Sequence, residues 1–151
     1  MSARTTQHTY TIKEAAALTG LPSSTLRYYE SIGVIAPIGR GESSKHRVYT
    51  DEDLDLLTWV ACLSATGMPV SDMRRYLENG SYGAEAAADQ VALLRAQQQK
   101  LELEAERLAV RKRYVALKIE YWQAVAAGDG GRAESLSREA RALADELKKR
   151  D

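Results

Sequence analysis

The segment that decides the fold is "LPSSTLRYYESIGVIAP", residues 21–37. Its proline and serines favour the start of a helix, and a glycine and a second proline favour the exit from it. At about 100° per residue, Leu26 and Tyr29 share one face of this helix, whereas Arg27 and Tyr28 lie on the other. The pattern predicts a short helix that buries one face and presents the other to a polar partner.

A second short helix is expected immediately before this segment. Thr11 and Glu14 form a capping-box pattern, in which the two side chains accept hydrogen bonds from each other's backbone amides. The turn "TGLP", residues 19–22, then leads into the next helix, which ends before Gly33. Two short helices joined by a turn that contains glycine form a helix-turn-helix pattern, whose second helix enters the major groove of DNA.

Glycine and basic residues follow in "IGRGESSKHRVYT", residues 38–50. The glycines favour a turn and the β-branched and aromatic residues favour short strands, so this segment predicts a two-stranded hairpin, or wing. Arg40, Lys45 and Arg47 would let the wing hold DNA together with the second helix. The alternative is that these residues are ordinary solvated charges. Thr50 then caps a third helix.

The charge distribution agrees with a DNA-binding N-terminal part. The whole chain of 151 residues has no net charge, but residues 1–50 carry six Lys or Arg and three Asp or Glu, and the remainder carries fifteen and eighteen. A local basic excess is what an electrostatic footprint on nucleic acid requires. No run of about eighteen apolar residues and no signal-peptide pattern is visible, so we expect a cytoplasmic protein with no membrane partner. The single cysteine, Cys62, excludes an internal disulfide.

These motifs resemble the DNA-binding domain of the MerR family of transcriptional regulators. The resemblance rests on "YTIKEAAALTGLPSSTLRYYESIGVIAP" and "HRVYTDEDLDLLTWVACLSATGMPVSDMRRYL", and it covers roughly residues 10–78. It implies a winged helix-turn-helix, a long antiparallel dimerisation helix, and a homodimer that binds double-stranded promoter DNA. Such a dimer would bend and untwist the promoter spacer so that RNA polymerase can use it.

The resemblance also implies which side chains contact DNA. Arg27 can reach a base edge or a phosphate, and Tyr28 can donate its hydroxyl to a phosphate while its ring packs over the sugar. The alternatives are an ion pair of Arg27 with Glu30 and a half-buried core position for Tyr28. Ser24 stands where the family commonly has a longer basic residue, and His46 stands where its wing usually has tyrosine. The predicted DNA-binding residues are Ser24, Thr25, Arg27, Tyr28, Arg40, Lys45, His46, Arg47 and Tyr49.

Residues 84–126 contain no proline and no glycine, and apolar residues recur in heptads along them, with polar breaks at Gln98 and Lys112. A continuous helix over this range would be roughly 65 Å long, so we expect it to pair with a second copy as a coiled coil. A two-fold dimer matches a pseudo-palindromic DNA site. The alternative is a long helix that folds back on its own chain. The predicted dimerisation residues are Val91, Leu94, Leu101, Leu108, Val115, Ile119 and Trp122.

A second apolar stripe runs along the opposite side of the same helix and consists of Ala96, Leu103, Val110, Leu117 and Ala124. The amphipathic segment of residues 132–149 is expected to fold back over this stripe. The predicted domains are therefore a winged helix-turn-helix at residues 1–80, a dimerisation helix at 81–127 and an accessory helix at 128–151. No bulky effector-binding domain fits in the last of these. The expected fold class is mostly α.

The cysteine content of the chain bears on the signal that the protein reads. Metal-sensing relatives carry paired cysteines and iron–sulfur relatives carry four, so we expect neither a metal nor a cofactor here. Cys62 shares a helix face with Trp59 and does not belong to the inward stripe of its helix. It is a candidate sensor thiol for an aldehyde or another electrophile, because a lone cysteine at this place resembles one branch of the family. The alternative is a small apolar packing residue.

Two other classes of protein fit parts of this pattern. A coiled-coil interaction protein would dock its N-terminal domain onto another protein, and salt-dependent binding to promoter DNA would distinguish the two functions. An enzyme is disfavoured, because no nucleophile–base pair, phosphate-binding loop or metal cluster is visible.

Overall fold

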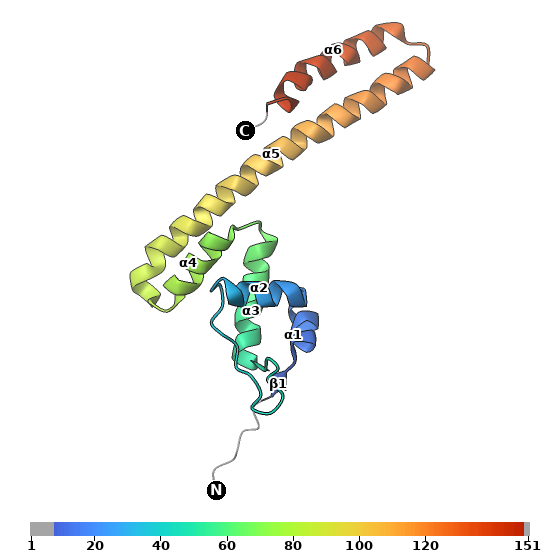
Figure 1. Cartoon of the computed structure of the whole chain (residues 1–151). Coiled ribbons are helices and arrows are strands. Elements are labelled where there is room, and N and C mark those ends of the chain that lie inside the picture. Colours follow the sequence, from blue (N-terminus) through green and yellow to red (C-terminus); the bar gives the residue numbers. More distant parts are fainter. Residues whose placement is uncertain (1–7, 150–151) are drawn as a thin grey trace. The chain divides into compact units, whose positions relative to one another are not determined.

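The computed structural model describes residues 8–149, and its elements follow the predicted order (Figure 1). Within these residues no helix is long and apolar enough to cross a membrane. The elements are β1 (Thr9–Tyr10), α1 (Ile12–Thr19), α2 (Ser23–Ser31), β2 (Tyr49–Thr50), α3 (Asp51–Ala65), α4 (Val70–Gly80), the 3₁₀ turn η1 (Gly83–Ala86), α5 (Ala87–Ala126) and α6 (Gly130–Leu147). The mostly helical fold class expected from the sequence is confirmed.

Capping boxes start two of the helices. At α1, Thr11 Oγ1 accepts the Glu14 amide at 3.2 Å, and the Glu14 carboxylate accepts the Thr11 amide at 3.1 Å. The same reciprocal pair forms at α3 between Thr50 and Asp53. Each box satisfies two backbone amides that have no partner inside the helix, which stabilises the helix start. The predicted capping residues Thr11 and Thr50 are therefore confirmed.

The core of the N-terminal domain is formed by side chains from α1 to α4. Leu26 and Tyr29 of α2 are buried against Leu57 and Val60 of α3 and Met73 of α4. Burying a large apolar side chain contributes about 1.5–3 kcal/mol relative to leaving it exposed. The inward face of α2 predicted from the sequence is confirmed, and it fixes which side chains of this helix face solvent.

The wing differs from the predicted two-stranded hairpin. Its arms meet at a single bridge between Arg40 and Arg47, with two further backbone hydrogen bonds from Val48 to Gly39 and from Gly41 to His46. The regular ladder lies elsewhere, because β2 pairs antiparallel with β1, with Thr9 opposite Thr50. The tip of the wing is a tight turn in which Lys45 adopts a positive φ of 61°, and this turn shortens the pairing of the arms.

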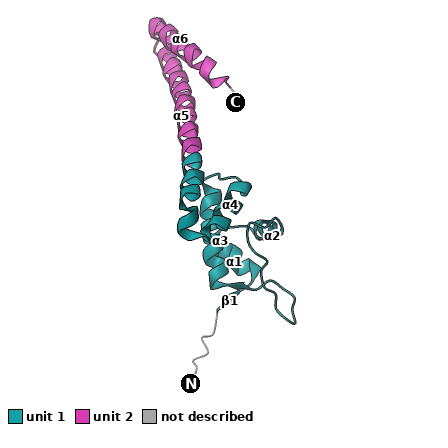
Figure 2. Ribbon diagram, turned by 90° about the vertical axis from the view of Figure 1, so that its left-hand side faces the viewer, with its two compact units in different colours: residues 1–97 teal, residues 98–151 magenta. Residues whose placement is uncertain are grey.

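The long helix predicted from the heptads is present as α5, an unbroken helix of 40 residues. The chain forms two compact units, one up to Gln97 and one from Gln98 onward (Figure 2). The division falls inside α5, whereas the domains predicted from the sequence follow the ends of the elements. The first part of α5 is thus part of the same compact unit as the helix-turn-helix.

In the second unit, α6 folds back along α5, as the sequence predicts (Figure 1). Leu117 and Ala124 of α5 are buried against Leu136 and Ala140 of α6. The helix α6 has 18 residues and is therefore about 27 Å long, so it covers only part of the stripe on α5. Leu103, farther along that stripe, remains 46% exposed.

Candidate nucleic-acid interface

The outer face of α2 presents Arg27 and Tyr28 to solvent. Tyr28 is 53% exposed, so the alternative of a core position for this ring is wrong. Arg27 is exposed, and within the described residues no hydrogen bond or ion pair holds its guanidinium. Ser24 is also exposed and Thr25 is half-buried on the same helix. One short helix therefore carries a free cation and a phenol hydroxyl on a surface open to a partner.

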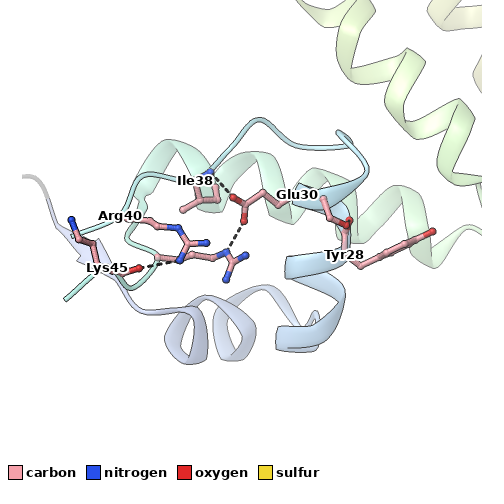
Figure 3. A network of polar contacts seen from close by, with 7 residues as sticks. Tyr28, Glu30, Ile38, Arg40 and Lys45 are labelled. Carbon is pink, nitrogen blue, oxygen red and sulfur yellow. Dashed lines mark hydrogen bonds and ion pairs between the residues drawn. The ribbon is translucent and has the colours of Figure 1, made fainter. Parts of the chain in front are cut away.

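The wing adds further basic side chains. Arg40, Lys45 and His46 are all exposed. Arg40 Nη1 donates to the carbonyl oxygen of Lys45 at 3.0 Å, which ties one arm of the wing to its tip (Figure 3). This bond holds the tip in place while the ammonium of Lys45 stays free to meet an anion.

Glu30 fastens the wing to the end of α2. Its carboxylate accepts a hydrogen bond from Arg47 Nε at 2.6 Å and another from the Ile38 amide at 3.2 Å (Figure 3). Both side chains of the ion pair are mostly buried, at 14% exposure for Glu30 and 22% for Arg47. Burial raises the pKa of Glu30, but the hydrogen bonds from Arg47 and Ile38 outweigh it and hold that pKa below its ordinary value. Sequence reasoning assigned Glu30 only as a partner for Arg27, and the 17 residues that separate Glu30 from Arg47 hide the pairing.

The structure corrects the prediction that Tyr49 contacts DNA. Tyr49 is fully buried, and its burial raises the pKa of the phenol. Its hydroxyl has no hydrogen-bond partner within the described residues. Successive residues of a strand point to opposite sides, and β2 turns Tyr49 into the core. Tyr49 is therefore a core residue beneath the wing and not part of the exposed surface.

The ion pair of Glu30 makes stability depend on pH in a defined window. Because the pKa of Glu30 is lower in the folded chain than in the unfolded one, its contribution is present above about pH 4.5 and is lost as the pH falls through the folded pKa. We expect the free energy of unfolding to fall more steeply in the wild type than in Glu30→Gln between about pH 6 and about pH 3. Denaturant titrations of both proteins measure this difference. Glu14 and Asp89 also have lowered pKa values, but both proteins contain them, so their contributions cancel in the difference between the two pH profiles. Identical pH profiles would contradict the role of Glu30.

A second cation supports the same, C-terminal end of α2. Arg74 of α4 donates a hydrogen bond through Nη2 to the carbonyl oxygen of Ile32, the residue that caps the C-terminus of α2. A positive charge at a helix C-terminus is favourable, because the last carbonyls carry partial negative charge. Sequence reasoning missed Arg74, since a bond across 42 residues leaves no local pattern. It helps to hold the exposed face of α2 in a fixed direction.

The candidate sensor residue lies apart from this basic surface. Cys62 on α3 is exposed, as its place outside the inward stripe predicts. It lines a groove of about 540 Å³ together with Trp59, Tyr76 and Leu77. Within residues 8–149 no group of three or more histidine, cysteine or acidic side chains could hold a metal ion.

Known proteins share both the sequence and the fold. Residues 10–80 match the family described as MerR HTH family regulatory protein. An HTH-type transcriptional regulator of Haemophilus influenzae, itself uncharacterised, is 34% identical over 113 residues, which are 75% of this chain and 80% of that protein. The regulator YyaN of Bacillus subtilis is 38% identical over 71 residues, or 47% of this chain and 51% of that protein.

Among solved structures, HiNmlR is described as a MerR family regulator that lacks the sensor domain, bound to promoter DNA. Its TM-score against this chain is 0.67, with 28% sequence identity, and the match covers 85% of this chain and 96% of that one. These relatives are DNA-binding regulators of transcription and not enzymes. Together with the helix-turn-helix and the basic wing, they show that this chain belongs to the MerR family of DNA-binding transcriptional regulators.

Proposed function

We propose that the chain binds the spacer of a promoter as a homodimer and distorts it to control its use by RNA polymerase. Two observations carry this proposal: the exposed basic surface of α2 and the wing, and the exposed apolar seam of the long helix α5. A relative of the same family has been crystallised on promoter DNA, which supports the same kind of partner. Footprinting on the promoter beside the protein's own gene would reveal the protected site.

At the DNA, the exposed residues have distinct expected roles. Arg27 reads a base edge in the major groove, and Tyr28 donates its hydroxyl to a phosphate. The wing residues Arg40 and Lys45 contact phosphates beside the groove. Ser24, Thr25 and His46 add short polar contacts around this centre. Arg47 stabilises the wing and does not contact DNA directly, because its guanidinium is already paired with Glu30.

The dimer is supported by apolar residues of α5 that nothing in the described chain covers. Leu101, Leu108, Val115 and Trp122 are 40%, 51%, 58% and 64% exposed, although they lie on one seam. Val91, Leu94 and Ile119 are exposed on the same side of the helix. The seam residues are spaced symmetrically about Leu108, so antiparallel pairing centred there places Trp122 of one protomer opposite Leu94 of its partner. Coiled-coil pairing would bury all of these side chains.

In the same register, the partner subunit would cover the groove beside Cys62. Gln90 forms part of that groove, and it lies about one helical turn from Leu94 on α5. The end of the partner's α5, with its own apolar patch around Ile119 and Trp122, would therefore reach the groove in the dimer. An electrophile that modified the exposed thiol of Cys62 would change this contact, which is the route by which we propose that a signal reaches the dimer.

The salt dependence of DNA binding tests the proposal. Within residues 8–149, Arg27, Arg40 and Lys45 are the interface cations that stay free of an ion pair. A dimer would make about six phosphate or base contacts through them, which gives a slope of log affinity against log salt of about −5. Fluorescence anisotropy on the footprinted site over a range of salt concentrations measures it. A slope shallower than about −3 would favour the protein-docking alternative.

A further inference from the structure

The start of α5 is joined to the DNA-binding domain by a stripe that is mostly polar. In the part of α5 up to Gln97, the residues that are not exposed are Asp89, Gln90, Leu93 and Gln97. Gln97 is 7% exposed and is the one buried polar residue of the described chain. The two glutamines lie seven residues apart and therefore on the same face of the helix. An ordinary helix-packing stripe would be apolar at these positions.

Both glutamines donate their side-chain amides to main-chain carbonyls of the domain. Gln97 Nε2 donates to Thr66 O at 2.6 Å, and Thr66 is the residue that caps the end of α3. Gln90 Nε2 donates to Tyr76 O in α4 at 2.8 Å, and its own Oε1 accepts from Asn79 at 3.1 Å. The amide nitrogen of Gln97, and not its oxygen, faces the Thr66 carbonyl, because two oxygen acceptors would repel each other there.

A hydrogen-bonded joint fixes direction more strictly than an apolar one. Apolar contacts tolerate small rotations and slides of a helix, whereas an amide–carbonyl bond weakens steeply outside its narrow range of distance and angle. Two such bonds, placed on Gln90 and Gln97, define the axis of α5 relative to α3 and α4. Adjacent to them, Arg75 and Asn79 of α4 both hold the carboxylate of Asp89.

We propose that Gln90 and Gln97 are positioning residues that set the direction in which α5 leaves the DNA-binding domain. In a dimer this direction determines the separation and the relative twist of the two recognition helices. The proposal rests on the proposed function, and it assigns to these residues the choice of half-site spacing and not the strength of binding to a half-site. Within the described residues the Oε1 of Gln97 has no hydrogen-bond partner, and this buried acceptor offsets part of the stability that the donated bond contributes.

The first test does not require DNA. Gln97→Glu replaces the donor by a carboxylate that faces the Thr66 carbonyl, and Gln99→Glu is the matched control at an exposed position of the same helix. We expect amide hydrogen exchange in residues 87–97 of the free full-length protein to become about tenfold faster in Gln97→Glu, which corresponds to the loss of one hydrogen bond, and to be unchanged in Gln99→Glu. If Gln97→Glu does not fold, Gln97→Met removes the donor without adding charge and takes its place. Unchanged exchange in the folded variant overturns the proposal.

The second test uses a series of operators whose half-sites are moved apart or together one base pair at a time. Wild type and Gln99→Glu should bind most tightly at one half-site spacing and lose affinity sharply one base pair away from it. In Gln97→Glu, the fold-loss of affinity for each base pair of added or removed spacing should be at least about threefold smaller. A change in stability alone would weaken binding to every operator equally and leave the optimum in place. An unchanged optimum in a variant with faster exchange overturns the inference. Absence of specific DNA binding by the wild type would instead refute the proposed function.

Discussion

Replacing Leu101 and Leu108 by glutamate should convert the dimer into monomers and lower operator affinity by about a thousandfold or more. The dimer would otherwise bury four leucines at these positions, each contributing about 1.5–3 kcal/mol. In the register centred on Leu108 the variant places two carboxylates next to each other at the centre of the seam and one more about 10 Å to either side. The desolvation of all four and the repulsion between the central two oppose pairing. A monomer keeps the contacts of one half-site only and loses the gain from binding the second half-site as a linked unit. Sedimentation equilibrium and anisotropy measure the two effects.

A matched control separates the seam from the rest of α5. Leu103→Glu makes the same substitution on the same helix, on the stripe that faces away from the proposed seam, and Leu103 is as exposed as the seam leucines. We expect this variant to remain a dimer with nearly unchanged affinity. Because Leu101 and Leu108 are exposed in the single chain, neither substitution should prevent folding, which circular dichroism verifies. A dimeric Leu101→Glu, Leu108→Glu protein would show that the chain pairs through another surface.

The parts of the fold that the sequence predicts well are those determined by near neighbours. Thr11 and Thr50 cap their helices through residues three positions away, and the inward face of α2 follows from the spacing of Leu26 and Tyr29. The heptads of α5 and the amphipathic pattern of α6 are also periodic. Each of these signals lies within one or a few helical turns, so it can be read without knowledge of the tertiary structure.

The parts that sequence reasoning missed depend on contacts between distant residues. Arg47 looks like any other basic residue of the wing until the fold brings it to Glu30, and Tyr49 looks like a DNA contact until β2 turns it into the core. Gln97 sits next to Gln98 and Gln99 in a polar run, and only its packing on the end of α3 distinguishes it. The side chains that hold the interface in place were therefore less predictable than those that form its exposed surface.

Arg27→Ala should weaken operator binding by roughly 1–3 kcal/mol for each half-site and relax the preference for one base pair in that half-site. The guanidinium has no partner in the described chain, so its removal leaves no unpaired charge in the protein and the loss is confined to the DNA contact. Arg40→Ala is the matched comparison, because a phosphate contact of the wing should weaken all sequences equally and make the salt slope shallower by about two in a dimer.

Binding to a set of operators with single base-pair changes in both half-sites distinguishes the two kinds of contact. Arg27→Ala should bind the operator that the wild type prefers less tightly than the wild type does. On operators changed at the base pair that Arg27 contacts, the two proteins should bind almost equally, because the wild type has already lost the same contact there. Arg27→Lys should recover part of the affinity but little of the preference, since an ammonium lacks the planar pair of donors that matches guanine. If Arg27→Ala weakens every operator to the same extent, Arg27 contacts a phosphate, and base recognition must come from other residues of the exposed face of α2.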